Sequence, residues 1–230
     1  MSLSGLQEKV LHNASCMARF IQTVTNGVTE IFRDPPFYLA LCNKVIHLFK
    51  TVPHFKVWVA GCGTGEEVVS LVILLSEAGL LNNALIYATD LNEVSLKKAA
   101  EGFFPLSQMK LYSRNYINAG GQGSLSDYYT AMYENAVFRK ELLENVTWAR
   151  HNLVSDGSFN EFDLILCRNV MIYFNKALQD RVHKLILESL PMNGFLALGN
   201  KESIHFTRYE KNYRELDSKE KIYQKVKYDK

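Results

Sequence analysis

Cysteine is scarce in this sequence, and its spacing matches neither a metal site nor a disulfide framework. The 230 residues include four cysteines, Cys16, Cys42, Cys62 and Cys167. None forms a Cys-x-x-Cys pair and no histidine cluster accompanies them, so no metal site is predicted. Cys62 and Cys167 stand at the ends of predicted strands and are expected to be small buried side chains. Free thiols without a secretion signal predict a cytoplasmic protein.

Long apolar runs and an excess of one charge are also missing. The longest apolar run is far short of the roughly 20 residues that span a bilayer, and the polar N-terminus has no signal-peptide core. These features predict no membrane insertion. The net charge of +2 gives no strong attraction to nucleic acid. With 47% hydrophobic and 22% charged residues, the composition is typical of one globular domain.

The most informative segment runs from residue 56 to residue 90. It combines a buried strand, a glycine turn, an apolar helix and a second strand that ends on Asp90. This order is typical of the nucleoside-binding half of a doubly wound sheet, with Gly61 and Gly63 in the turn. Glycine turns also occur in α/β proteins that bind no ligand, so the acidic residue after the second strand strengthens the case for a cofactor.

Two carboxylates, Glu66 and Glu67, occupy the first helical turn after the glycines. A dinucleotide site places its pyrophosphate at this helix end, where free N–H groups and the helix dipole attract anions. The two carboxylates would repel a phosphate, and the spacing is GxGxG rather than GxGxxG. A cationic adenosine compound such as S-adenosylmethionine fits better, with its ribose near Asp90. We expect one glutamate to face the ligand and the other to face solvent.

The rest of the chain alternates helices and strands, which predicts a mostly parallel sheet. A helical pattern covers residues 3–26, and a second helix over 37–50 follows Asp34 as its cap and two prolines. A later helix starts from a cap at Asn175 and runs to about Leu190. Further strands are expected at residues 146–153, 162–167, 195–198 and 221–226. We divide the chain into an N-terminal helical segment and linker, 1–50, and an α/β domain, 51–230.

Residues 103–146 form an inserted section within that domain. A crossover between parallel strands needs only about a dozen residues, and this connection is far longer. It is rich in tyrosine and contains a glycine loop at residues 120–123. Long insertions of this kind are usually lids or binding elements. We expect a small aromatic-rich subdomain over the site, with an inert surface excursion as the alternative.

Polar residues cluster at four predicted strand ends, which converge on one edge of a parallel sheet. The ends lie at residues 61–67, 90, 151–153 and 168–169. Arginine is almost never buried unpaired, so Arg168 needs a carboxylate partner from the protein or the substrate. Asn152 and Asn169 offer amide groups to an adenine or a ribose. Each asparagine alone is more typical of a loop cap, and only as a set around one cleft do the two indicate a ligand site.

Five motifs follow one another in a fixed order, at residues 29–35, 60–67, 88–90, 162–174, and 198–199 with 202–203. Together they resemble the motifs of the CheR-type chemotaxis receptor methyltransferases, over about residues 25–226. The resemblance implies a doubly wound, Rossmann-like sheet of S-adenosylmethionine-dependent methyltransferases, with a short N-terminal helical segment and a small inserted subdomain. It implies methyl transfer from S-adenosylmethionine to glutamates of chemoreceptors, with S-adenosylhomocysteine as the second product.

The resemblance also implies roles for individual residues. Arg33 and Tyr173 would lie at the reacting methyl group. Cofactor contacts would come from Thr29, Arg33, Gly61, Gly63, Glu67, Asp90, Asn152, Leu153, Arg168 and Asn169. The insert would be the family's β-subdomain, which can dock tails of the partner, the cytoplasmic domain of a chemoreceptor. A glutamate substrate is ionised at neutral pH and needs no general base, so no catalytic histidine is expected and His151 has no assigned role.

Two departures from the family pattern concern the N-terminal part. Gly27 stands where the family usually has asparagine two positions before Thr29, with Asn26 one residue earlier. The N-terminal helical part is also shorter than is typical, at roughly 25 residues, so the receptor is less certain than the chemistry. Alternatives are a non-catalytic S-adenosylmethionine-binding docking module, a small-molecule carboxyl methyltransferase and, disfavoured by the acidic turn, a dehydrogenase.

Overall fold

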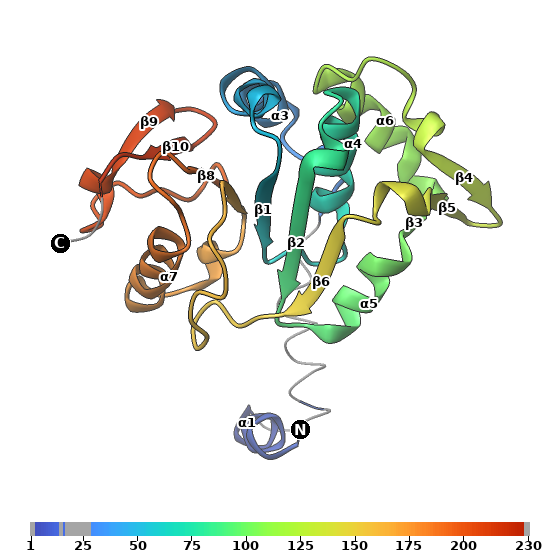
Figure 1. Ribbon diagram of the computed structural model, residues 1–230. Helices are drawn as coiled ribbons and strands as arrows, with labels where there is room; N and C mark the ends of the chain where they lie inside the picture. The colour runs from blue at the N-terminus through green and yellow to red at the C-terminus, as the bar shows by residue number, and fades with distance from the viewer. Residues whose placement is uncertain (1–2, 14–15, 17–28, 228–230) are drawn as a thin grey trace.

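A seven-stranded sheet forms the centre of the described part of the chain, residues 3–13, 16 and 29–227, in a computed structural model (Figure 1). The strand order is β6-β2-β1-β7-β8-β10-β9. Strands β6, β2, β1, β7 and β8 run parallel, and β10 and β9 add an antiparallel edge. The predicted α/β fold with a mostly parallel sheet is confirmed. The strands are β1 (Phe55–Ala60), β2 (Ala84–Asp90), β6 (Val146–Arg150), β7 (Leu164–Cys167), β8 (Phe195–Leu198), β9 (Tyr213–Asp217) and β10 (Ile222–Lys225).

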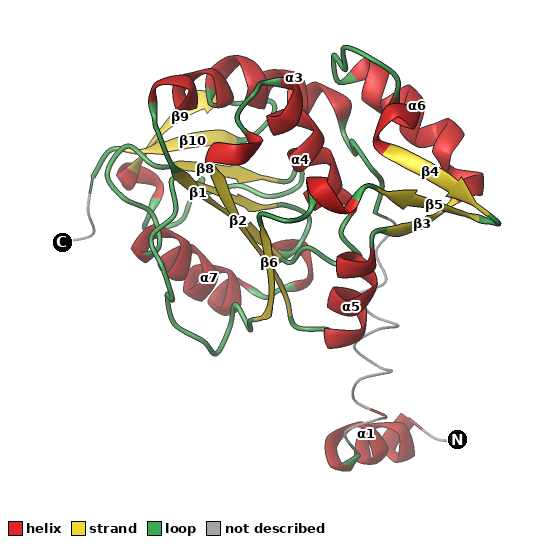
Figure 2. Ribbon diagram, turned by 45° about the vertical axis from the view of Figure 1, so that its right-hand side comes forward, coloured by secondary structure: helices red, strands yellow, loops and turns green. Residues whose placement is uncertain are grey.

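Helices cover both faces of this sheet (Figures 1 and 2). Helices α3 and α4 lie on one face and α7 lies on the other. Helix α5 follows β2 and packs Leu96 into the core on the α4 side. Outside the insert, the described residues form the α-helices α1 (Leu3–His12), α3 (Pro35–Lys44), α4 (Glu66–Glu77), α5 (Glu93–Glu101) and α7 (Lys176–Glu188). They also form the short 3-10 helices η1 (Ile46–Thr51), η2 (Leu81–Asn83), η6 (Met171–Tyr173) and η7 (Glu210–Asn212).

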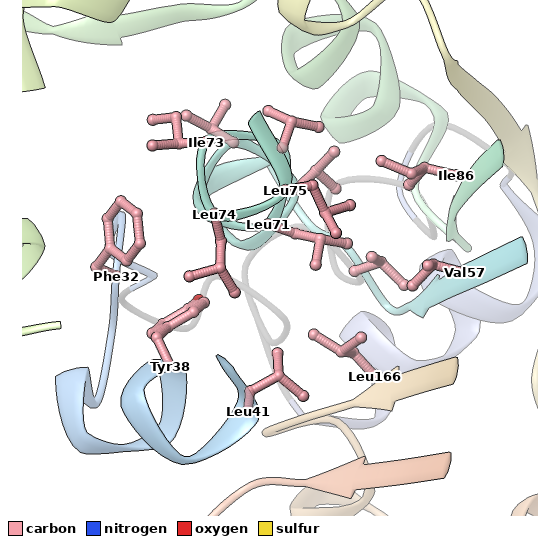
Figure 3. Close-up of a cluster of buried hydrophobic side chains, with 14 of the residues drawn as sticks. Phe32, Tyr38, Leu41, Val57, Leu71, Ile73, Leu74, Leu75, Ile86 and Leu166 are labelled. Carbon is pink, nitrogen blue, oxygen red and sulfur yellow. The ribbon is translucent and has the colours of Figure 1, made fainter. Parts of the chain in front are cut away.

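The alternation of side chains along the central strand explains why both faces are apolar. Val57 and Val59 of β1 join the core that contains α3 and α4, whereas Trp58 and Ala60 join the core that contains α7. Successive strand residues point to opposite faces, so the buried positions of a strand covered on both sides are apolar on both faces. Figure 3 shows the first core, in which Leu71, Leu74 and Leu75 of α4 lie among the strand residues Val57 and Ile86 and the α3 residues Tyr38 and Leu41.

Some element boundaries differ from the prediction. The helix predicted over 37–50 is α3 from Pro35 to Lys44, and η1 follows. At Val45 the backbone, with φ −127° and ψ −57°, leaves the α-helical conformation. The change turns Ile46 and Phe49 into the core, where Phe49 stacks on Phe55 with ring centroids 4.4 Å apart. Burial of these two side chains therefore overrides continuation of the helix.

Strand ends differ as well. Strand β6 stops at Arg150 rather than at Leu153, because the side chain of Asn152 accepts a hydrogen bond from the Val154 N–H at 2.9 Å and turns the chain. Strand β7 begins at Leu164 rather than at residue 162. Strand β9, at the antiparallel edge, was not predicted, and its exposed Arg214 and Glu215 gave no apolar signal.

Other expectations for the N-terminal part and the cysteines are resolved in part. Helix α1 occupies the start of the predicted 3–26 helix and ends at His12, because the described backbone at Asn13 is no longer helical. Of residues 14–26 the structure describes Cys16 alone, so the rest of that prediction, with Asn26 and Gly27, lies outside the described residues. Cys62 and Cys167 are 4% and 0% exposed, and burial raises the pKa of both thiols. Both behave as the small apolar side chains that the sequence predicted. Within the described residues, we find no helix with the length and apolar content that a bilayer crossing requires.

The insert forms a sheet of its own beside α4 and α5 (Figure 2). Its strand order is β3-β5-β4, with neighbours antiparallel. The predicted glycine loop follows α6, and the two tyrosines Tyr116 and Tyr128 donate hydrogen bonds to Glu77 at the end of α4. These bonds fasten the insert to α4, which covers one face of the main sheet. Its elements are β3 (Phe103–Pro105), η3 (Leu106–Gln108), α6 (Met109–Asn118), η4 (Leu125–Tyr128), β4 (Tyr129–Met132), β5 (Asn135–Phe138) and η5 (Lys140–Leu142).

Candidate cofactor and active site

A cleft of about 230 Å³ lies beyond the carboxyl ends of β1, β2, β6 and β7. From β1 the chain adds β2 and β6 on one side, and it returns to place β7 on the other side. Open α/β sheets bind ligands where the strand order reverses in this way. The structure brings together all eleven residues singled out by sequence, namely Thr29, Arg33, Gly61, Gly63, Glu67, Asp90, Asn152, Leu153, Arg168, Asn169 and Tyr173.

Two glycines of the turn after β1 serve different purposes. Gly61 has φ 80°, and a Cβ there would lie 2.5 Å from Cγ2 of Val170. It therefore allows the loop after β7 to approach the turn. Gly63 has φ 56°, and a Cβ there would meet no atom within 4 Å. The space above Gly63 belongs to the cleft, which leaves room for a ligand against the backbone.

Three consecutive N–H groups of the glycine turn are already engaged by the protein. Gly61 and Cys62 donate to the carbonyl oxygen of Thr89 at 2.8 and 2.9 Å. Gly63 donates to Oδ2 of Asp90 at 2.9 Å, and Asn92 donates to Oδ1 at 2.8 Å. A pyrophosphate needs such N–H groups free, so this turn is poorly suited to a dinucleotide. The Asp90 carboxylate keeps lone pairs for further donors, such as ribose hydroxyl groups.

The two glutamates at the start of α4 both point inward, so the expectation that one faces solvent is wrong. Glu66 is 7% exposed and accepts a hydrogen bond from the Thr64 hydroxyl at 2.6 Å. Glu67 lines the cleft and accepts from the Arg168 guanidinium. Burial raises the pKa of both carboxyls; the Thr64 hydrogen bond opposes the rise in Glu66, and Arg168 opposes it in Glu67.

Arg168 obtains its partners from the protein. Its side chain is 1% exposed, its Nη1 lies 2.7 Å from Oε1 of Glu67, and its Nη2 lies 3.1 Å from Oδ2 of Asp34. The guanidinium carbon also lies 3.7 Å from the centroid of the Phe37 ring. One buried cation thus joins the loop after β7 to α4 and to the segment before α3.

Asp34 does not act as the predicted side-chain cap of α3. It occupies the N-cap position with φ 57°, but its side chain makes no capping hydrogen bond. Its carboxylate reaches Arg168 instead, because that buried guanidinium needs a second acceptor. The adjacent Arg33, half-buried, is thereby held at the cleft, where Tyr173, with 53% exposure, also lies.

The charges around the cleft suit a cationic ligand. The lining carboxylates are Glu30, Glu67 and Asp90, and the lining guanidinium groups are Arg33 and Arg168. Asp34 adds a further carboxylate beside Arg168. The residues present therefore fit S-adenosylmethionine, which needs room against the glycine turn, acceptors for its ribose and negative charge near its ammonium and sulfonium groups.

Two residues that matter here had no predicted role. Glu30 lines the cleft next to Thr29, and its carboxylate accepts a hydrogen bond from Asn115 of the insert at 3.0 Å. Glu202 stood inside a quoted motif, and the structure shows its carboxylate bound to the loop after β7. Position beside a predicted site residue was the available signal for Glu30. For Glu202, the available signal was its place in a quoted motif shortly after the buried strand β8.

Comparison with known proteins gives consistent matches. Residues 27–222 match the CheR methyltransferase, SAM binding domain. A Pseudomonas putida protein named as a methyltransferase, Cher3, is 47% identical over 225 residues, which cover 98% of this chain and 82% of that protein. The chemotaxis protein methyltransferase of Listeria monocytogenes is 30% identical over 197 residues, or 84% of this chain and 71% of that protein. Among solved structures, the N-methyltransferase NodS of Bradyrhizobium japonicum with S-adenosyl-L-homocysteine aligns at 10% identity and a TM-score of 0.41, over 85% of this chain and 70% of that one.

Proposed function

This chain belongs to the CheR methyltransferase family, so its cofactor is S-adenosylmethionine, and on that premise we propose that it methylates glutamate side chains of chemoreceptors. The products would be glutamate methyl esters and S-adenosylhomocysteine, formed on receptor domains in the cytoplasm. The observation that carries the proposal is the cleft, where Arg33 and Tyr173 lie together with all the predicted cofactor residues. The names of the chemotaxis relatives support the receptor as substrate.

The cofactor residues divide by the part of the ligand that each suits. Asp90 would accept hydrogen bonds from the ribose hydroxyls, and Asn152, Leu153 and Asn169 would surround the nucleoside with amide and apolar groups. Glu67, with Thr29 and Arg33 nearby, would contact the amino-acid end. Gly61 and Gly63 would let the ligand approach the backbone, and Arg168 would hold Glu67 and Asp34 in place.

When bound, S-adenosylmethionine supplies an electrophilic methyl group, which the substrate carboxylate takes from sulfur while the sulfur keeps the electron pair. A glutamate with a pKa near 4.3 is already ionised, so no protein base is needed. Arg33 would hold the incoming carboxylate in line with the reacting bond, and Tyr173 would donate a hydrogen bond to it. The neutral ester no longer pairs with Arg33, which favours release.

The insert would supply the docking surface for the receptor. Among the described strands, β4 pairs with β5 and forms one edge of the insert sheet. Three of its four residues are exposed. Such an edge can accept an extended peptide as a further strand, because main-chain groups on its outer side remain available.

The test is a methyl-transfer assay with a soluble cytoplasmic receptor fragment and S-adenosylmethionine labelled in the methyl group. We expect label on glutamate residues, identified by mass spectrometry, and release of methanol in mild base, as an ester requires. Base-stable label would contradict the ester product.

The same assay separates the alternatives. Cofactor binding without transfer to any acceptor would favour a docking module. Transfer to a small carboxylic acid but not to the receptor fragment would favour a small-molecule methyltransferase. A parallel calorimetric titration with S-adenosylhomocysteine and with NAD keeps the cofactor question apart from the substrate question.

A further inference from the structure

Glu202 is a buried carboxylate that, within the described part of the chain, accepts hydrogen bonds from four backbone N–H groups. It lies in the segment after β8 and is 5% exposed. Its Oε1 accepts from Val170 at 2.8 Å and from Met171 at 2.7 Å. Its Oε2 accepts from Asn169 at 2.8 Å and from Gly199 at 2.7 Å. Each carboxylate oxygen thus receives two charge-assisted hydrogen bonds, which are stronger than neutral ones.

Three of these donors are consecutive residues of the loop after β7. Asn169 is left-handed with φ 60°, and Val170 follows with φ −107° and ψ −51°. Left-handed and right-handed residues in succession direct neighbouring N–H groups toward one side and create an anion-binding hollow. Hollows of this kind bind phosphate groups and iron–sulfur clusters in other proteins. Here the chain supplies the anion from its own Glu202.

The loop held by Glu202 carries four groups of the cleft. Arg168 directly precedes the loop, and Asn169 and Val170 are its first two residues. Tyr173 is the last residue of the 3-10 helix η6, which begins at Met171. Val170 is pressed against Gly61, where a Cβ would lie 2.5 Å from Cγ2 of Val170. The Tyr173 side chain is 53% exposed, so packing around its ring does little to place it. Its position depends on the backbone of the loop.

The chemistry of the position calls for a carboxylate. A carboxylate offers about four acceptor sites and no donor, which matches the four N–H groups. Glutamine has the same size but would turn an NH₂ group toward two of those donors. Aspartate keeps the charge and lacks one methylene group. Glu202→Gln therefore tests whether two acceptor oxygens are needed, and Glu202→Asp tests whether the length of the side chain is needed.

We propose that Glu202 is a positioning residue for methyl transfer, which fixes the loop of residues 169–173 and through it the Tyr173 hydroxyl and the Asn169 amide in the cleft. Glu202 itself touches neither the cofactor nor the reacting carboxylate. The inference rests on the proposed function for the part that concerns turnover. Its structural part stands on the four hydrogen bonds alone.

The experiment compares Glu202→Gln, Glu202→Asp, Tyr173→Phe and the double variant Glu202→Gln/Tyr173→Phe in the full chain. The matched control is Val182→Ala, which opens a gap in the same core that contains Met171 and leaves the Glu202 carboxylate and its four N–H donors in place. Thermal melts establish that each variant is folded at the assay temperature. The measured quantities are kcat at saturating cofactor, the Kd for S-adenosylhomocysteine and amide hydrogen exchange over residues 168–174.

We expect Glu202→Gln to lower kcat at least about tenfold and to speed exchange at Asn169, Val170 and Met171. Affinity for S-adenosylhomocysteine should fall by less than about fivefold, since most cofactor residues lie on other elements. Glu202→Asp should recover part of the lost turnover. In the Tyr173→Phe background, Glu202→Gln should lower kcat by no more than about threefold, because both substitutions act through the same Tyr173 hydroxyl.

Three outcomes would overturn the inference. Exchange over 169–171 that stays unchanged in Glu202→Gln would show that the carboxylate does not hold the loop. Losses in kcat that simply multiply in the double variant, or an equal loss in Val182→Ala, would show a general effect on folding. If the unsubstituted protein methylates no acceptor, the proposed function is wrong, and the exchange and affinity measurements still decide whether Glu202 holds the loop.

Discussion

At the scale of the residue, the guanidinium of Arg168 satisfies two carboxylates that are expensive to bury alone. Glu67 and Asp34 approach it from different elements, at 2.7 and 3.1 Å. A charge removed from water is costly unless a partner compensates it, so losing one member of such a group is worse than never having had the group. Arg168 therefore matters to stability as well as to the site.

We predict that Arg168→Met lowers the free energy of unfolding by about 3–5 kcal/mol, because it strands two carboxylates. The control is Arg150→Met, which removes a pair with Glu93 at 3.8 Å whose side chains are 63% and 64% exposed. That exposed pair should contribute less than about 1 kcal/mol. Urea unfolding of both variants measures the difference, and losses of equal size would contradict the structural role given to Arg168.

Arg33 and Tyr173 are the residues that the proposal places at the reacting methyl. We predict that Arg33→Ala and Tyr173→Phe each lower turnover at least tenfold, about 1.4 kcal/mol of barrier or more. Cofactor affinity should change less in Tyr173→Phe, since that hydroxyl would contact the substrate. Tyr133→Phe, at a 95% exposed tyrosine of the insert, is the control. Near-normal turnover in both site variants would remove the catalytic assignment.

A buried histidine away from the cleft gives the protein a measurable acid sensitivity. His183 of α7 is 3% exposed, and burial lowers its pKa from 6.5 to about 4, with Asp180 opposing the shift. At pH values between these two, His183 binds a proton in the unfolded chain and stays neutral in the folded protein. Stability therefore falls as the pH drops from 6.5 toward 4.

We predict that His183→Leu reduces this pH dependence, which amounts to at most about 3 kcal/mol for a shift of this size. Urea unfolding at several pH values between 7 and 4 would show a flatter curve for the variant. The control is His47→Gln, at an exposed histidine, which should leave the slope unchanged. Identical slopes for the unsubstituted protein and His183→Leu would mean that His183 takes its proton normally in the folded state.

At the scale of the element, helix α6 ties the insert to the segment that carries Arg33. Asn115, 7% exposed, donates from Nδ2 to Oε2 of Glu30 at 3.0 Å and to the carbonyl oxygen of Ile31 at 3.2 Å. Removing one partner of a buried hydrogen bond leaves the other unsatisfied, which costs about 1–3 kcal/mol of stability. The insert is therefore part of what shapes the cleft, in addition to any docking role.

We predict that Asn115→Ala lowers turnover about fivefold and the free energy of unfolding by about 1–3 kcal/mol, because the segment of residues 30–33 loses its hydrogen bonds to the insert. Asn118→Ala is the matched control, at an exposed asparagine of the same helix. Turnover and urea unfolding of the two variants are compared directly. Full turnover in Asn115→Ala would show that the segment of residues 30–33 keeps its position without the hydrogen bonds from Asn115.

At the scale of the whole molecule, the two cores share one sheet and should melt together. Strands β1 and β7 contribute side chains to both cores. A ligand bound at the ends of these strands should therefore stabilise the entire domain. We predict that S-adenosylhomocysteine at 100 times its Kd adds about 2.7 kcal/mol, or roughly 5–10 °C in one melting transition. NAD at the same concentration should give no shift, and a shift with NAD alone would contradict the choice of cofactor.

Sequence reasoning predicted the parallel sheet and the contents of the cleft because both follow from local pattern. Apolar runs, the glycine turn and polar residues after strands are local signals, and parallel strands bring their carboxyl ends to one edge. That rule alone predicts that Gly61, Asp90, Asn152 and Arg168 lie together at one edge of the sheet. The cleft confirms their placement, and their roles stay predictions.

The tertiary structure decided which partners these residues take. Local pattern could not tell that Asp34 would leave its helix for Arg168, that Glu66 and Glu67 would both turn inward, or that Glu202 would bind the loop after β7. Each choice matches a buried charge or N–H group with an acceptor distant in the chain. Periodicity records which face of an element is buried, whereas hydrogen-bond partners depend on distances that exist only after the elements have packed.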